Sequence, residues 1–403
     1  MAAKKLSPQF DQDGSQQEFS AYQRKSLDLL SFVAVNRYRV LRKENKNSFY
    51  YALDSIPVIG SCLYWIITFN TGVKAVFLAF LITDYFGPVE FADKIGALDY
   101  ILCTGLIVLA WTIFFEKYPL YEILQSSWKV MNEMYVEMNC NKEVLQEVKG
   151  TQKLIAAVNI GISVFGGTSL MMQYFADPKY CIFTYSSFEL DILPLRLLFA
   201  LHEFLFMTLA WDAYLAAVAI TMYQSVAMSR IVDQMTEKLN ALKPNQHNLC
   251  QDFDHLLKNY RMLTILTNHL NDTIAYKTLF THLVAGCQFV SDVYASTHII
   301  KLPGAVFIDI FFYIEDGTTA AFVILRIYEY MSCLAPAADR FLRGIRMFQL
   351  RMRGNPELGK RSKKKARSLQ PISLKVGPCR IAPEAMLTVL DQMTTYSLAA
   401  ALW

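Results

Sequence analysis

Four acidic side chains stand out because they fall inside stretches that are otherwise apolar. Asp292 lies in one such stretch, and Asp309, Glu315 and Asp316 lie in the next. Carboxylates are costly in apolar surroundings unless they are hydrated or paired. The acids therefore indicate a wet, polar pocket for a ligand or a negatively charged route that attracts cations. If the second stretch begins later in the chain, Glu315 and Asp316 lie instead at the interface between the membrane and water.

A second group of polar side chains crowds the end of the chain. By helical spacing one face of this segment is polar at its start and apolar at its end. A helix that lines a water-filled conduit with a hydrophobic constriction has this pattern. A buried bundle helix whose hydroxyls bond to neighbouring helices has it too. The face consists of Thr388, Gln392, Thr395, Ala399, Leu402 and Trp403.

The sequence lacks the short motifs of the common enzyme classes. It contains no GxGxxG, Walker A, HExxH or GxSxG pattern, and its eight cysteines are dispersed without a CxxC pair. Neither a zinc site nor a disulfide framework is indicated. A net charge of +4 gives no basis for binding nucleic acid. We therefore expect no enzyme, no cofactor, no metal and no nucleic-acid partner.

These side chains would be positioned by helices, because seven stretches approach the roughly 20 mostly apolar residues that cross a bilayer. Apolar residues make up 54% of the 403-residue chain and charged residues 18%. The predicted fold class is therefore all-α, a polytopic membrane protein with seven transmembrane helices. The expected spans are Leu63–Phe86, Ala97–Phe115, Leu154–Phe175, Leu193–Met222, Tyr276–Ile300, Gly304–Ala335 and Ile381–Trp403. The apolar segment Tyr50–Phe69 also suggests a packed or interfacial helix upstream.

The basic residues predict which ends of these spans face the cytosol. If the N-terminus is cytosolic, 32 Lys and Arg residues fall in the segments on that side, and Lys94, Lys179 and Lys301 fall on the other. Cytosolic loops carry such an excess. The sequence thus predicts a cytosolic N-terminus and an extracellular C-terminus. The sequon at Asn271 would then be cytosolic and unmodified.

This topology divides the chain into six parts. Residues 1–62 form a cytosolic arm with the interfacial helix, 63–222 the first four spans, and 223–275 two cytosolic amphipathic helices; 276–335 form the fifth and sixth spans, 336–380 a basic cytosolic loop, and 381–403 the pore-lining span. The amphipathic pair is either a simple hairpin below the membrane or a platform for subunit contacts. The run Lys360–Arg367 is either a solvated loop or a patch that faces anionic lipid.

The chain resembles the insect-type chemoreceptors, which are the gustatory and odorant receptors of arthropods. The resemblance rests on the inside-out seven-helix topology and on the ending TYSLAAALW, Thr395–Trp403, with ARSLQPISLKVGP before it. Trp211-Asp212 and Tyr223-Gln224 are weaker similarities. Leu402 stands where the family commonly has Gln.

The resemblance implies a ligand-gated, non-selective cation channel in the plasma membrane, in contact with lipid. Four identical or related subunits would line one pore with their last helices, and the outer gate would fall on Ala399 and Trp403. A small-molecule tastant or odorant would bind in the outer half of each subunit. The candidate ligand residues there are Tyr100, Met171, Tyr174, Phe199, His202, Phe289, Tyr294, Phe307 and Phe311. The alternatives are an odorant receptor subunit that needs a co-receptor and a seven-helix metabotropic receptor with an external N-terminus.

Overall fold

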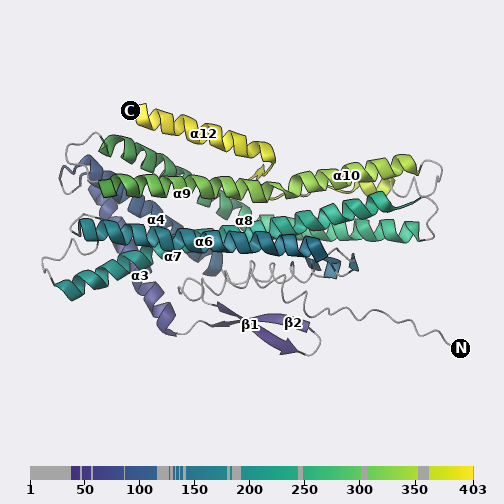
Figure 1. The fold of residues 1–403 in the computed structure, drawn as a ribbon, viewed down its shortest axis with the longest axis horizontal. Helices are drawn as coiled ribbons and strands as arrows, with labels where there is room; N and C mark the ends of the chain where they lie inside the picture. Colours follow the sequence, from purple (N-terminus) through teal and green to yellow (C-terminus); the bar gives the residue numbers. More distant parts are fainter. Residues whose placement is uncertain are drawn as a thin grey trace.

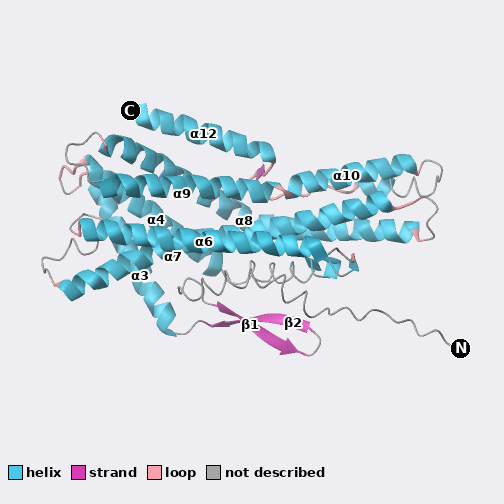
Figure 2. Cartoon of the chain, viewed as in Figure 1, coloured by secondary structure: helices cyan, strands magenta, loops and turns pink. Residues whose placement is uncertain are grey.

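The structure, a computed structural model, describes most of the chain from residue 38 to residue 402. It leaves out residues 46–47, 56–57, 86, most of 116–141, 179–181, 184–191, 244–247, 301–306 and 353–362. The described part is a long molecule built almost entirely from helices, with two small hairpins (Figures 1 and 2). The predicted all-α class is confirmed. Trp403, most of the N-terminal arm and the start of the lysine-rich run lie outside the described residues.

Each of the seven apolar stretches corresponds to a helix. These helices are α3 (Val58–Ile82), α4 (Phe91–Phe115), α6 (Lys142–Ala176), α7 (Leu193–Ala241), α8 (Leu249–Ile299), α9 (Phe307–Ser332) and α12 (Pro383–Leu402). None of the helices in the described ranges combines the length and the apolar composition that crossing a membrane requires.

Two of these helices are much longer than the predicted spans. α7 has 49 residues and α8 has 51, so each is about 75 Å long at 1.5 Å per residue. The predicted amphipathic helices are therefore continuous with the fourth and fifth spans. Their predicted apolar stripes are confirmed as buried faces, with Met228, Met235 and Leu239 on α7 and Phe253 and Leu263 on α8.

The segment expected as a basic loop begins instead with helix α10 (Leu334–Arg351). The phenyl rings of Phe253 and Phe348 stack at 4.7 Å between α8 and α10, and those of Tyr260 and Phe341 stack at 4.8 Å. The Arg340 guanidinium of α10 forms a salt bridge with the Asp233 carboxylate of α7 at 2.7 Å. The loop prediction was wrong here because α10 has one strongly apolar face that α7 and α8 cover. We call residues 223–275 with α10 the stem, and the rest of the helices the bundle.

The described end of the lysine-rich run lies on the stem. Residues 363–367 form a short helical turn. The Lys365 ammonium contacts the Asp254 carboxylate at 2.5 Å, and Arg261 donates to the Ser368 hydroxyl at 3.0 Å. Asp254 lies about 33 Å along α8 from the start of the expected span at Tyr276. This distance favours a role in stem packing over contact with lipid.

The hydroxyl of Tyr260 links α8 to the segment that follows the lysine-rich run. It donates to the carbonyl of Gln370 at 3.0 Å. Burial raises the pKa of this phenol well above its ordinary value. The hydroxyl therefore stays protonated and able to donate across the physiological pH range.

The residues before α3 form strands where a helix was expected. β1 (Tyr38–Asn45) pairs with β2 (Ser48–Ser55) in an antiparallel hairpin, and α3 begins at Val58. The expected interfacial helix from Tyr50 is therefore wrong for residues 50–55. The segment SFYYALDS contains three consecutive aromatic residues, and aromatic side chains favour strands.

Close contact between α6 and α7 depends on two glycines in the Gly-rich third stretch. A Cβ atom on Gly167 would lie 2.1 Å from the Thr208 hydroxyl oxygen and 2.8 Å from the Phe204 carbonyl oxygen. One on Gly166 would lie 2.7 Å from the Trp211 ring. The missing side chains therefore set the distance between the two helices.

A small hairpin, β3 (Lys375–Val376) and β4 (Cys379–Arg380), leads into α12 and is held on α8. Its turn residue Gly377 has φ +56, and its N–H donates to the Ala275 carbonyl at 2.7 Å. The Asn271 amide donates to the Ser373 carbonyl at 3.0 Å and accepts from the Lys375 N–H at 2.9 Å. Asn271 is thus buried and engaged, which supports the expectation that its sequon is unmodified.

Candidate functional site

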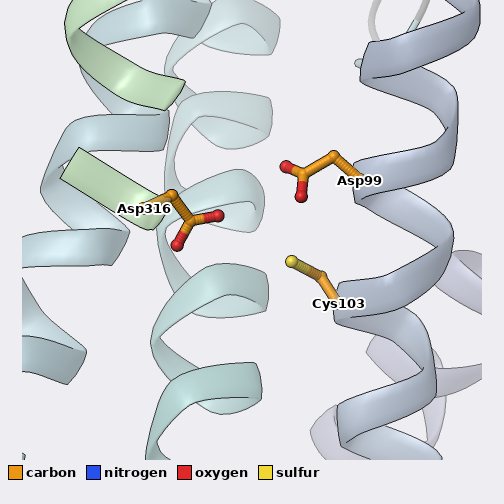
Figure 3. Close-up of side chains that lie close together, drawn as sticks. All are labelled: Asp99, Cys103 and Asp316. Atoms are coloured by element: carbon orange, nitrogen blue, oxygen red, sulfur yellow. The ribbon is translucent and has the colours of Figure 1, made fainter. Parts of the chain in front are cut away.

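Two carboxylates and a thiol meet in the interior of the bundle. Asp99 and Cys103 lie one turn apart on α4, and Asp316 faces them from α9 (Figure 3). All three side chains are buried, and their potential ligand atoms lie within 4.8 Å of one another. We call these three residues the acid–thiol cluster.

α8 adds two buried side chains to the acid–thiol cluster. The Gln288 amide donates to the Asp316 carboxylate at 2.5 Å and lies 3.7 Å from the Cys103 sulfur. Asp292, one turn further along α8, is fully buried, and both of its carboxylate oxygens lack a hydrogen-bond partner among the described residues. Its Cβ atom would lie 3.0 Å from a Cβ on Gly317 of α9. No side chain larger than hydrogen therefore fits at residue 317 without movement.

The acids singled out from the sequence are thus only partly brought together. Asp292 and Asp316 are both fully buried in the same part of the bundle, whereas Glu315 is half-buried and its carboxylate lies 3.4 Å from the Thr319 hydroxyl. The side chain of Asp309 lies outside the described residues. Sequence reasoning missed Asp99, although it is a carboxylate in the apolar stretch Ala97–Phe115 and the same argument would have found it.

A cavity of about 790 Å³ lies between α12 and the bundle. Its lining comes from α3, α4, α8, α9, β3 and α12 and is mostly apolar. The polar side chains in the lining include His282, Ser291, Gln392 and Tyr396. Ligand pockets for small molecules have this size and this sparse polarity.

The predicted polar face of α12 is exposed. α12 runs along one side of the bundle, with its C-terminal end away from the stem (Figure 1). Met393 is buried against the bundle, and Met386 and Val389 are partly buried there. The described members of the predicted face are exposed, namely Thr388, Gln392, Thr395, Ala399 and Leu402. In a single chain this face of α12 is therefore not covered by the other described helices.

Three of the candidate ligand residues lie where α3, α4 and α7 meet. The ring of Tyr100 is buried and stacks on Phe206 at 4.6 Å. The Lys74 ammonium lies 5.8 Å from the centre of the Tyr100 ring. His202 lies 3.1 Å from the Asn70 amide nitrogen, and its ring is 6.5 Å from that of Phe199.

The other candidates are dispersed over the bundle. Tyr174 is buried and meets Phe183 edge-on at 5.3 Å. Met171 and Phe289 pack against the core, and the side chain of Phe307 lies outside the described residues. Tyr294 lines the cavity beside α12, whereas Phe311 is 41% exposed. The nine candidates therefore do not form one pocket.

Comparison with solved structures gives the relatives of this fold. The chain is similar to the insect olfactory receptor OR5 from Machilis hrabei in complex with eugenol, with a TM-score of 0.67 and 12% identity over 96% of this chain and 98% of that chain. Another structure of the same receptor gives a TM-score of 0.65 and 13% identity over 94% and 98%. No family model matches the chain. No curated protein matches it significantly.

The match covers nearly the whole of both chains, so the architecture as a whole is shared. The chain thus shares the all-helical fold of these solved structures. More particularly, it is the fold of the insect olfactory receptors, and the resemblance to insect-type chemoreceptors is confirmed at the level of the fold.

Proposed function

We propose that this protein is a chemoreceptor that acts as a ligand-gated, non-selective cation channel in the plasma membrane. The observation that carries the proposal is α12, a polar face left exposed on the last helix of a chain with the insect olfactory receptor fold. Four subunits would bring four such faces around one axis. Thr388, Gln392 and Thr395 would line the inner part of the pore, and Ala399, Leu402 and Trp403 would narrow its outer mouth.

The distribution of exposed apolar side chains supports a bundle embedded in lipid. Large apolar residues such as Phe69, Phe165 and Leu198 are exposed on α3, α6 and α7. Among the described residues of the stem, the large apolar side chains that are exposed are those of Ile265, Met347 and Leu350. The bundle therefore carries most of the exposed large apolar side chains. Exposed apolar patches of this extent mark contact with a membrane or a partner. The seven bundle helices would then be the spans, with the N-terminus and the stem in the cytosol.

The cavity beside α12 is the candidate place of ligand action. A small organic molecule there would contact Met393 on the proposed pore helix and Tyr294 on α8. A ligand shifts an equilibrium between closed and open states by the difference in its affinity for the two. A ligand in contact with α12 would have such a difference in affinity when opening moves α12 relative to the bundle. The aromatic group around Tyr100 and His202 is the second candidate place.

Two adjacent threonines give a sharp test of the pore assignment. Thr395 lies on the proposed pore face, and Thr394 points about 100° away around the helix. Both are exposed. We expect Thr395→Val to reduce the ligand-evoked cation current several-fold, because it removes a hydroxyl that would contact permeating ions, whereas Thr394→Val leaves it unchanged. Equal currents in the two variants, at equal surface expression, would contradict the assignment.

Expression alone and with a co-receptor tests whether the protein acts by itself. We expect ligand-evoked cation current from the full chain expressed alone. Current that appears only with a second subunit supports the odorant-subunit alternative. A response that depends on a G protein, without current carried by this chain, supports the metabotropic alternative.

A further inference from the structure

The acid–thiol cluster has the ligand set of a transition-metal site. We propose that Asp99, Cys103 and Asp316 bind a divalent metal ion of the zinc class inside the bundle. Each offers one ligand atom, two carboxylate oxygens and one sulfur, from two helices that are far apart in sequence. Ligand atoms within 4.8 Å of one another can close around one ion with small side-chain movements.

The thiol decides the class of ion. Calcium and magnesium take oxygen ligands in proteins. Zinc takes cysteine sulfur and carboxylate oxygen together, and softer ligands select for it over the hard cations. A thiol that lies beside two carboxylates therefore points to zinc or an ion of similar chemistry.

Independent support comes from buried polar atoms beside the cluster. The side chain of Gln288 is fully buried and its amide nitrogen touches the cluster, yet its carbonyl oxygen has no hydrogen-bond partner among the described residues. The same holds for both carboxylate oxygens of Asp292. A buried polar atom without a partner carries a desolvation cost of about 1–3 kcal/mol. A four-coordinate ion held by the three cluster residues has one ligand position left, and an ion with this position directed at α8 would engage one of these oxygens.

The local charge also favours a cation. The charged side chains that act on Asp292 are Asp99, Asp316 and Glu315, and all of them are acids. Several carboxylates gathered in a buried place repel one another. A divalent cation between α4 and α9 would offset this repulsion and join helices that otherwise meet through α8. The proposal concerns ion binding alone and does not depend on channel activity.

Cobalt provides a direct readout of the sulfur ligand. The full chain, purified in detergent through a tag without histidines and stripped with a chelator, is titrated with Co²⁺. We expect a charge-transfer absorption band from the bond between cobalt and the Cys103 thiolate. Added zinc should remove this band because it displaces the cobalt. Cys103→Ser should abolish the band, whereas Cys287→Ser, at an exposed cysteine of α8, should keep it. A band that survives Cys103→Ser would overturn the proposal.

The carboxylates are tested by zinc affinity. Asp316→Asn should weaken zinc binding by about tenfold or more, and Asp272→Asn, at an exposed acid of α8, should leave it unchanged. Equal affinities of the two variants would contradict the proposal. If a cluster variant does not fold, the wild-type chain still decides the question. A wild-type protein that carries no zinc as isolated and gives no cobalt band would overturn the proposal.

Discussion

At the scale of single residues, Asn271 illustrates how one amide can fix the approach to the proposed pore helix. We expect Asn271→Asp to lower the free energy of unfolding by about 1–3 kcal/mol, because a buried carboxylate would face the Ser373 carbonyl in place of a donor. Chemical denaturation of the full chain in detergent measures this change. Asn268→Asp, at an exposed position one turn earlier on α8, is the control. Equal unfolding free energies for both variants would contradict the role of Asn271.

The candidate site was predictable residue by residue only where local sequence carried the signal. Asp292 and Asp316 could be found because each interrupts an apolar stretch. Cys103 and Gln288 could not, because a thiol or an amide in such a stretch is unremarkable until the fold brings α4, α8 and α9 together. The aromatic candidates failed to gather for a related reason, since buried aromatic side chains fill cores as readily as they line pockets.

At the scale of elements, the packing of α6 on α7 depends on the absence of a side chain. We expect Gly167→Ala to destabilise the bundle by about 1–3 kcal/mol, because its methyl group would overlap Thr208 and the Phe204 backbone. Gly161→Ala, on the same helix with nothing within 4 Å of the added atom, should be neutral or slightly stabilising. Thermal unfolding of the two variants makes the comparison. Similar melting temperatures would show that the two helices do not meet as described.

The cavity beside α12 can be filled without disturbing its walls. Gly286 lines the cavity, and a Cβ atom there meets nothing within 4 Å. We expect Gly286→Leu to raise the ligand concentration for half-maximal current by about tenfold, because the new side chain competes with the ligand for space. Gly161→Leu, at an exposed position on α6, is the matched control. An unchanged dose response for Gly286→Leu would move the ligand site elsewhere, with the group around Tyr100 as the next place to test.

Helix positions followed from hydropathy, but helix ends did not. All seven apolar stretches contain a helix, since runs of apolar residues near 20 in length favour one. The joins near residues 223 and 275 were invisible, because an amphipathic helix can continue a wholly apolar one without a break in the backbone. α10 was missed because its many arginines suggested a loop, although its apolar residues recur at helical spacing.

At the scale of the whole molecule, the proposed orientation is open to direct measurement. We expect an epitope tag at the N-terminus to be reached by antibody only after the cells are permeabilised, because 32 of the basic residues would then lie in cytosolic segments. A tag placed after Trp403 should be reached on intact cells. Labelling of the N-terminal tag on intact cells would reverse the topology and favour the metabotropic alternative.

Assembly is the second property of the whole molecule that can be tested. We expect particles with fourfold symmetry in detergent, with the α12 helices nearest the axis, since the exposed polar face of α12 is costly in lipid. Imaging of the purified chain measures the symmetry directly. A particle in which α12 lies on the outer rim, facing detergent, would contradict the pore assignment.

The unbroken course of α7 and α8 has a mechanical consequence. A rod of about 75 Å has no joint at which movement of one end can be absorbed. If a bound molecule tilts the end of α8 that lies away from the stem, the opposite end shifts with it, and the aromatic stacks between α8 and α10 receive that motion. A contact made at the end of the bundle away from the stem would therefore shift the stem as well, and stiffening the stem should make that far end harder to move.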